Sequence, residues 1–350
     1  MRILTLLIVC SVLISCNGYN KSKTEIESKK IESIVAPIVN PPETKNGIVY
    51  FSYNNGGTWQ NKSEGLPDTI NVGLGAIAVS EDLLAIATKE NGIFIFDFKE
   101  DHWIKTFTDD LIIKSNIGPL VFFKNQIFVG TKKNGVFSTK DLGKNWTNYS
   151  VGLASPTIRK LIQIDNKLYA GTNSGLYSFN ESEKKWELEY GNSKMQVNGM
   201  TDFDGSIYIG TNQGGFSTIK GRKDWKQFLA NFTLHNISSD DNTIYAMVYN
   251  ELFSSKDKGE SWQNIQSGLP EELYTFNIIK NGNSIFAGQW GGVYRKENSN
   301  DIWKSYSTGL PNKLAITNMN LYHGIIVVSG NNRGLKNGMS IDKWLSYNNL

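Results

Sequence analysis

Five side chains are the strongest candidates for ligand binding in this chain of 350 residues. Trp290 follows a short apolar run, where matching segments elsewhere in the chain carry Asn or Lys. Its indole could stack on a sugar or contact a peptide, or it could equally pack on a neighbouring loop. Arg159 and Arg333 could hold a carboxylate through paired N–H groups. Asn198 and His235 stand, like Arg159, at the start of apolar runs. The chemistry that these residues suggest is binding, and no catalytic residue is predicted.

Metal and cofactor chemistry is not indicated by the sequence. The three histidines, His102, His235 and His323, are far apart in the chain, and the two cysteines, Cys10 and Cys16, both lie near its start. A transition-metal site needs several such ligands at short spacing. We therefore predict no metal and no cofactor.

A glycoside hydrolase remains an alternative, because it needs only two carboxylates several ångströms apart. The acidic residues available in predicted loops are Asp68, Glu90, Asp109, Asp110, Glu251, Glu271 and Glu272. Nothing in their spacing marks two of them as partners. Enzymatic activity is therefore left open, with a non-catalytic function favoured.

The N-terminus reads as an export signal. Arg2 precedes an apolar run that is too short for a membrane-spanning helix, and the run ends at Leu13-Ile14-Ser15-Cys16. This ending resembles the bacterial lipoprotein signal, which implies that residues 1–16 are the signal and that Cys16 is acylated. The alternative is a small-residue cleavage site beside an incidental cysteine. Polar residues 17–45 then form a flexible tether. We expect a lipid-anchored protein of the bacterial cell envelope, most simply at the outer membrane.

Charge argues against nucleic acid as a partner. The chain holds 36 basic and 33 acidic residues, and no long run of one sign occurs. The expected partners are a protein or glycan of the envelope and, through the lipid, the membrane itself. A monomer is expected.

Tryptophans recur through the chain with a nearly constant spacing. Eight of the nine fall in phase, 37 to 44 residues apart: Trp59, Trp103, Trp146, Trp186, Trp225, Trp262, Trp303 and Trp344. Between them lie short alternating apolar runs and polar pairs such as Asp165-Asn166, which favour tight hairpins. A period near 40 with four strands predicts an all-β fold, a β-propeller of four-stranded antiparallel blades over residues 46–350.

Seven blades are favoured and eight are possible. In the seven-bladed arrangement, the opening hairpin from Gly47 to Trp59 joins the inner strands of Thr317–Gly330 to close the ring, and residues after Arg333 add a strand or tail. Loops between the second and third strands of each blade should gather on one face, the default ligand site. The loop candidates besides Trp290 and Arg333 are Lys89-Glu90, Lys132-Lys133, Asn173, Asn212-Gln213, Asn250-Glu251, Gln289 and Asn331-Asn332.

The last hairpin of three blades carries a shared motif, [ST]-x-[DN]-x-G-x-[NST]-W. Its members are Ser52, Asn54, Gly56 and Trp59; Thr139, Asp141, Gly143 and Trp146; and Ser255, Asp257, Gly259 and Trp262. The motif resembles the Asp-box, or BNR, repeat, in which the box is structural and lies on the face opposite the usual ligand site. The carboxylate and hydroxyl would cap free backbone donors of the turn, with glycine in the left-handed position.

The resemblance extends over about residues 46 to 346, to non-catalytic Asp-box propellers of the sortilin and photosystem II assembly factor-like types. The run Leu168–Tyr177 also looks like the sensor propellers of two-component regulators. A sialidase would need three arginines around one carboxylate. The chain after the signal has Arg159, Arg222, Arg295 and Arg333, and two of these fall in outer hairpins on the wrong side. The resemblance therefore implies a binding or assembly module for a polypeptide or glycan, with a hydrolase of neutral or uronic sugars as the alternative.

Overall fold

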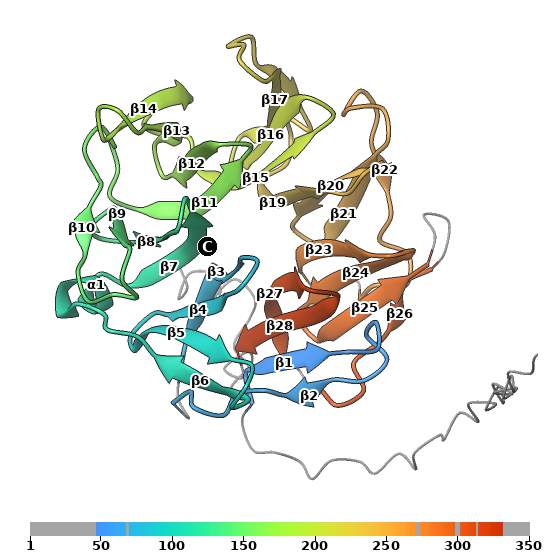
Figure 1. The fold of residues 1–350 in the computed structure, drawn as a ribbon. Coiled ribbons are helices and arrows are strands. Elements are labelled where there is room, and N and C mark those ends of the chain that lie inside the picture. The colour runs from blue at the N-terminus through green and yellow to red at the C-terminus, as the bar shows by residue number, and fades with distance from the viewer. Residues whose placement is uncertain (1–46, 68–69, 271–273, 298–301, 313, 332–350) are drawn as a thin grey trace, which may run out of the picture. The chain divides into compact units, whose positions relative to one another are not determined.

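Seven four-stranded antiparallel sheets form a ring in the computed structural model (Figure 1). The model describes residues 47–67, 70–270, 274–297, 302–312 and 314–331. Cys16, the tether, Arg333 and the strand or tail expected after it lie outside the described residues. The predicted all-β propeller is confirmed, and its blade count is seven.

Each blade runs from an inner strand at the ring axis to an outer strand at the rim. Blade 1 comprises β3 (Val72–Val79), β4 (Leu84–Thr88), β5 (Gly92–Asp97) and β6 (His102–Lys105). Blade 2 follows a short helix, α1 (Asp110–Lys114), and comprises β7 (Ile117–Phe123), β8 (Gln126–Thr131), β9 (Val136–Thr139) and β10 (Thr147–Asn148). Blade 3 comprises β11 (Ile158–Ile164), β12 (Lys167–Thr172), β13 (Gly175–Asn180) and β14 (Lys185–Tyr190).

The later blades repeat this order. Blade 4 comprises β15 (Val197–Phe203), β16 (Ser206–Thr211), β17 (Gly214–Ile219) and β18 (Lys226–Phe228). Blade 5 comprises β19 (Leu234–Ser239), β20 (Ile244–Val248), β21 (Glu251–Ser255) and β22 (Gln263–Asn264). Blade 6 comprises β23 (Thr275–Asn281), β24 (Ser284–Gln289), β25 (Gly292–Lys296) and β26 (Lys304–Ser305).

Blade 7 closes the ring with strands from both ends of the described chain. Its inner strands are β27 (Ala315–Tyr322) and β28 (Ile325–Asn331), and its outer strands are β1 (Val49–Ser52) and β2 (Gln60–Asn61). Strand β1 pairs antiparallel with β28, from Val49 opposite Ser329 to Ser52 opposite Ile326. In Figure 1 this is the contact of the blue and red strands. The predicted closure by the opening hairpin is therefore confirmed, and the eight-bladed alternative is wrong.

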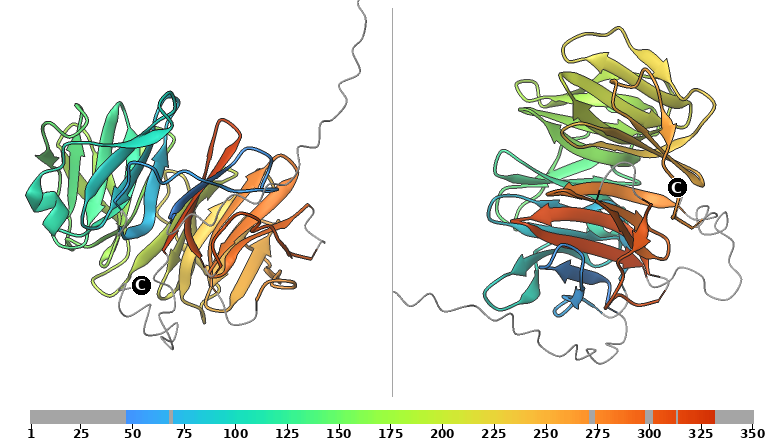
Figure 2. Two further views of the ribbon diagram at one scale, coloured as in Figure 1. Left: turned by 90° about the horizontal axis from the view of Figure 1, so that it is seen from below. Right: turned by 90° about the vertical axis from the view of Figure 1, so that its right-hand side faces the viewer.

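The core lies between the blades, because the middle strands of each blade are covered on both faces. All five residues of β4 and all five of β20 are buried, which is why these strands are apolar runs without strict alternation. The two turned views show the sheets as twisted layers packed face to face (Figure 2). No helix within the described ranges is long and apolar enough to cross a membrane.

At four of the seven seams, a tryptophan joins neighbouring blades through both its amide and its indole; at the seam between blades 1 and 2, Trp146 donates only its indole, to the Phe107 carbonyl (3.3 Å). The Trp103 amide donates to the Glu64 carbonyl (2.8 Å) and its indole Nε1 to the Lys62 carbonyl (2.6 Å), both in the preceding blade. Trp59, Trp186 and Trp303 make the same pair of bonds, which we call the tryptophan clamp. The acceptors precede four similar segments, which therefore receive the next blade's tryptophan: Gly65-Leu66-Pro67, Gly152-Leu153-Ala154, Gly268-Leu269-Pro270 and Gly309-Leu310-Pro311.

The box residues make local hydrogen bonds within their hairpins. The Thr139 hydroxyl donates to Asp141 Oδ1 (2.8 Å) and accepts from the Gly143 amide (2.8 Å), while Asp141 Oδ1 accepts from the Asn145 amide (2.9 Å). Ser255, Asp257 and Gly259 repeat this pattern, and so do Ser52, Asn54 and Gly56. The side-chain amide of Asn145 is the main cause that lowers the pKa of Asp141 to about 2, and the Ser261 hydroxyl does the same for Asp257. Both carboxylates are therefore engaged in their turns.

Candidate functional site

One face of the ring carries the candidate site. In a four-stranded antiparallel blade, the loop between the second and third strands leaves from the same side as the connection to the next blade. We call this side the loop face; the box hairpins lie on the opposite side. The residues closest to the axis on the loop face come from the start of the inner strands.

A β-bulge places one extra residue near the start of five inner strands. The register shifts between Ile158 and Lys160 in β11, and shifts occur at the equivalent points of β15, β19, β23 and β27. The residues passed over are Arg159, Asn198, His235, Phe276 and Thr317. A bulge redirects a side chain out of the regular alternation. Three sequence candidates therefore occupy equivalent positions in adjacent blades 3, 4 and 5.

Arg159 is held by two amides of the loop face. Its Nε donates to Asn198 Oδ1 (2.6 Å) and its Nη1 to Asn173 Oδ1 (3.1 Å). Asn198 in turn donates through Nδ2 to the Leu234 carbonyl of blade 5 (2.8 Å). The guanidinium has five N–H donors, and among the described residues its partners are neutral. The arginine is thus oriented, with donors left for a carboxylate.

Two lysines from the preceding blades complete a cationic cluster, which we define as Lys89, Lys132 and Arg159. Lys89 follows β4 and Lys132 follows β8, in the second-to-third loops of blades 1 and 2. Burial, together with the charges of Lys89 and Arg159, lowers the pKa of Lys132 to about 8. Burial also lowers the pKa of Lys89, an effect that the Glu90 carboxylate opposes. Like charges held together in a half-buried site create a positive potential that favours an anion.

His235 connects the cationic cluster to a row of aromatic rings. Burial, and secondly the charge of Arg159, lowers the pKa of His235 to about 4, so its imidazole is neutral at pH 7. Its ring lies 4.7 Å from that of Tyr274, which contacts Tyr249 at 5.0 Å and Phe276 at 5.8 Å. Only Tyr249, 42% exposed, presents much surface among these tyrosines and Phe276. We call Tyr249, Tyr274, Phe276 and Trp290 the aromatic row.

Trp290 is buried in this row, so its indole is not free on the loop rim. It is 1% exposed and lies 6.3 Å from Phe276 in a cluster with Tyr274 and Ala315. The residue directly follows β24, and its ring turns onto the start of the neighbouring inner strand. The Trp290 indole therefore packs against its neighbours, which is the second of the two alternatives that the sequence left open. A stacking platform for a ligand would have to be Tyr249.

One buried acceptor beside the cationic cluster has no partner. The Lys132 amide donates to the backbone carbonyls of Ser115 and Asn116 (both 3.1 Å). The side-chain Oδ1 of Asn116 is buried and accepts no hydrogen bond from any described residue. A ligand or a water molecule could donate a hydrogen bond to this oxygen. In the part of the chain that the structure describes, no cluster of three or more His, Cys, Asp or Glu could hold a metal ion.

The structure thus unites Arg159, Asn198 and His235 and leaves Arg333 outside the described residues. Tyr249 and Tyr274 were missed in the sequence, although Tyr249 directly precedes the candidate loop Asn250-Glu251. The position of Tyr249 directly before this polar turn was the sequence signal that could have identified it as a site residue. Of the candidate acids, Asp109 is occupied as the N-cap of α1, where it accepts from the Leu111 amide (2.7 Å).

Comparison with known proteins shows the fold and no closer kinship. No family model matches the chain, and no curated protein matches it. Among solved structures, it is similar to the complex titled "YCF48 bound to D1 peptide", with a TM-score of 0.59 and 12% identity, over 75% of this chain and 95% of that one. It also resembles the extracellular domain of the one-component system BT4673 from B. thetaiotaomicron, with a TM-score of 0.58 and 16% identity, over 74% of this chain.

A third similar structure belongs to an enzyme. The GH74 xyloglucanase from Xanthomonas campestris matches with a TM-score of 0.57 and 15% identity, over 76% of this chain and 52% of that one. The chain spans only 40% of the BT4673 domain. Because all three are less than 25% identical to this chain, these likenesses show the β-propeller fold alone.

Proposed function

We propose that this protein is a non-catalytic binding module of the cell envelope whose loop face holds an acidic polypeptide. The observation that carries the proposal is the guanidinium of Arg159, held by Asn173 and Asn198 among like charges. Amide partners orient an arginine without neutralising it, so its charge remains available to a carboxylate. Tyr249 adds an aromatic surface on the same face, which suits a peptide side chain.

The known propellers are consistent with this function. A structure of YCF48 with a peptide and several extracellular sensor domains share the fold. They support a protein partner outside the cytoplasm by fold likeness alone. The lipid anchor at Cys16 belongs to this proposal. Metabolic labelling with a fatty-acid analogue should label the wild-type chain and leave Cys16→Ala unlabelled; label retained in Cys16→Ala contradicts the anchor.

The binding proposal is tested with two anionic probes on the full chain. One is a fluorescent hexaglutamate peptide, and the other is an oligogalacturonate. A charge-assisted hydrogen bond contributes about 1.5–3 kcal/mol, so Arg159→Gln should weaken peptide binding by about ten- to a hundredfold. Lys133→Gln is the matched control, because Lys133 carries the same charge as Lys132 on the same loop but is exposed. The affinity of the Lys133→Gln variant for the peptide should change less than about twofold.

Either of two results contradicts the proposal. Equal losses for Arg159→Gln and Lys133→Gln would mean that binding is unspecific charge attraction. Binding of oligogalacturonate with no binding of the peptide would assign the site to an acidic glycan.

A hydrolase of neutral or uronic sugars is the second candidate, supported by the GH74 neighbour. Glu90 is the acid to test, since it follows Lys89 of the cationic cluster. Release of reducing sugar from xyloglucan or polygalacturonate that disappears in Glu90→Gln, with folding unchanged, would favour the enzyme over the binding module.

A further inference from the structure

Three seams lack the tryptophan clamp, and one of them also leaves its indole without an acceptor. Trp146 donates its indole to the Phe107 carbonyl (3.3 Å) and Trp262 to the Gly259 carbonyl (3.1 Å), whereas Trp225, between blades 3 and 4, has no acceptor among the described residues. At clamped seams, the tryptophan indole donates to the carbonyl three residues beyond the preceding tryptophan, as Trp103 does to Lys62 and Trp186 to Tyr149. Between blades 3 and 4 this bond is missing. The indole Nε1 of Trp225 is buried and has no hydrogen-bond partner among the described residues. A buried donor without an acceptor is unfavourable, and this seam therefore lacks a hydrogen bond that the clamped seams possess.

The cause lies in the outer strand of blade 3. The other outer strands are two to four residues long, whereas β14 extends over six, Lys185–Tyr190. The carbonyl at the equivalent position belongs to Glu189, which is still within the strand. Elsewhere the chain has already turned and offers its carbonyl to the next blade. The longer strand therefore leaves Trp225 without its usual acceptor.

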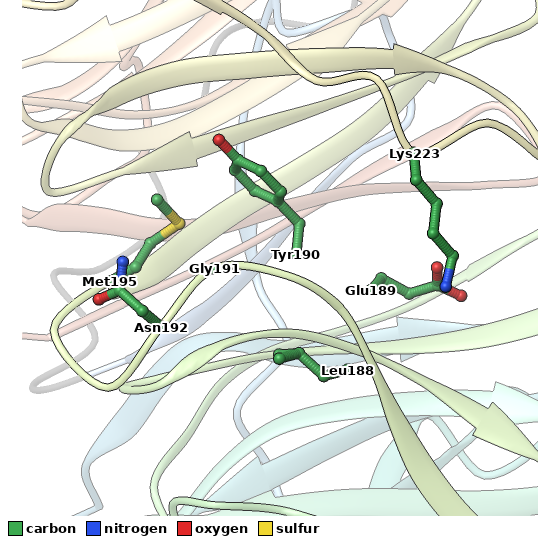
Figure 3. Close-up of a pocket in the computed structure, with 7 residues that line it drawn as sticks. All are labelled: Leu188, Glu189, Tyr190, Gly191, Asn192, Met195 and Lys223. Atoms are coloured by element: carbon green, nitrogen blue, oxygen red, sulfur yellow. The ribbon is translucent and has the colours of Figure 1, made fainter.

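The same seam contains a cavity of about 400 Å³ (Figure 3). Leu188, Tyr190 and Met195 of blade 3 and its following loop line it, and Lys223 of blade 4 stands at its edge. The Tyr190 ring stacks on Trp225, with ring centres 4.7 Å apart. Leu188 is 50% exposed, so the lining includes apolar surface open to solvent. A ligand with an apolar side chain could bury this surface.

The backbone of β14 favours a strand as the ligand. It is the last strand of its sheet, and its outer edge pairs with no other described strand. An exposed edge presents alternating N–H and C=O groups that an extended peptide can pair with. Charge adds a preference, because two lysines share one carboxylate. Glu189 is bound to Lys167 (2.6 Å), and the charge of Lys223, whose amine lies beside Glu189 in Figure 3, also helps to lower the pKa of Glu189. One positive charge therefore remains in excess. An acidic residue in the ligand would complement Lys223.

We propose that an extended polypeptide segment binds this rim site as a fifth strand of blade 3. It pairs with the outer edge of β14, places an aliphatic side chain beside Leu188, Tyr190 and Met195, and carries an acidic residue toward Lys223. A second copy of this chain is a poorer occupant. Antiparallel pairing of two β14 strands centred on Leu188 sets Glu187 opposite Glu189 twice, which is unfavourable. The lining of the rim site includes no residue of the cationic cluster or the aromatic row, so the site does not depend on the function proposed above.

The test is a selection of peptides from a phage-displayed library of random dodecapeptides on the full chain, with Leu188→Lys as the counter-selection. Enriched peptides should alternate aliphatic residues and include Asp or Glu. They should bind Leu188→Lys at least tenfold more weakly. Ile104→Lys is the matched control, because Ile104 is 47% exposed on the outer strand β6 next to the clamped Trp103. Binding should be unchanged in that variant and in Arg159→Gln.

Nuclear magnetic resonance gives the second readout. The indole N–H resonance of Trp225, assigned by its loss in Trp225→Phe, should shift when a selected peptide binds. Replacing the peptide's central aliphatic residue with proline should abolish binding, because proline cannot donate to a strand.

Three results would overturn the rim site. These are the absence of enriched peptides, enriched peptides that bind Leu188→Lys as well as the wild type, and an unmoved Trp225 resonance. Dimerisation of the wild type that Leu188→Lys abolishes, without peptide binding, would assign the edge to a second copy instead.

Discussion

A methyl group at Gly152 should open the seam between blades 2 and 3. Gly152 has φ +92° and belongs to the segment that receives the Trp186 clamp. A Cβ there would overlap the carbonyl oxygen of Trp186 and lie 3.0 Å from its amide nitrogen. Because these are backbone atoms, the clash is relieved only if the two blades move apart.

Gly221→Ala provides the matched control. Gly221 also has a positive φ, +82°, but nothing lies within 4 Å of a Cβ built there. Both substitutions carry the cost of a left-handed alanine, roughly 1–2 kcal/mol. Gly152→Ala should additionally lose the two clamp bonds, about 1 kcal/mol each, and add roughly 1–3 kcal/mol of overpacking.

The free energy of unfolding should therefore fall by roughly 3–5 kcal/mol more in Gly152→Ala than in Gly221→Ala. Urea denaturation followed by tryptophan fluorescence measures this difference. Hydrogen exchange at the Trp186 amide locates it, since that amide should lose protection only in Gly152→Ala. Equal destabilisation by the two alanines would show that the close approach to Trp186 does not hold the seam, and would refute the reasoning.

Three further predictions concern stability. Because the pKa values of Asp141 and Asp257 are lowered to about 2 in the fold, the free energy of unfolding should fall as pH drops from about 4 to about 2. The Asp141→Asn and Asp257→Asn double variant should lose much of this fall in acid titration, and an unchanged slope would contradict the capping role. Because the pKa of Lys132 is lowered to about 8, the free energy of unfolding should rise between about pH 8 and 10.5. Lys132→Met should flatten that rise in urea titrations and Lys133→Met should not; equal behaviour would count against the cluster. Trp290→Ala should reduce the free energy of unfolding by about 3–5 kcal/mol, whereas a stable Trp290→Ala would argue against the burial of its ring.

The ring and its blades could be predicted because their signals are local. Each blade is a series of hairpins, and turn residues such as Asp165 and Asn125, both at positive φ, mark where the chain reverses. The tryptophan period then gives the length of one blade, although eight tryptophans in phase left the count at seven or eight. Closure by β1 and β28 followed from the leftover hairpin at one end and the leftover inner strands at the other.

The candidate site could be predicted only in part, because it depends on contacts across blades. Lys89, Lys132 and Arg159 come from three blades, and only the curvature of the ring brings them together. The bulge that redirects the Arg159 side chain is not marked by any residue pattern in strand β11. The burial of Trp290 could not be predicted either. Its position directly after a strand is compatible with exposure, and the contact with Phe276 that buries it becomes visible only in the folded blade.

Blade 7 cannot form until the end of the described chain has been synthesised, because its strands come from both ends. Its outer hairpin leaves the ribosome first and its inner strands last. At roughly 5–20 residues per second, the hairpin waits on the order of tens of seconds for its partners. Until then the apolar strand Val49–Ser52 lacks its partner β28, and its unpaired N–H and C=O groups can pair with a strand of another chain. A chaperone that covers this strand until β28 has been made would prevent such pairing.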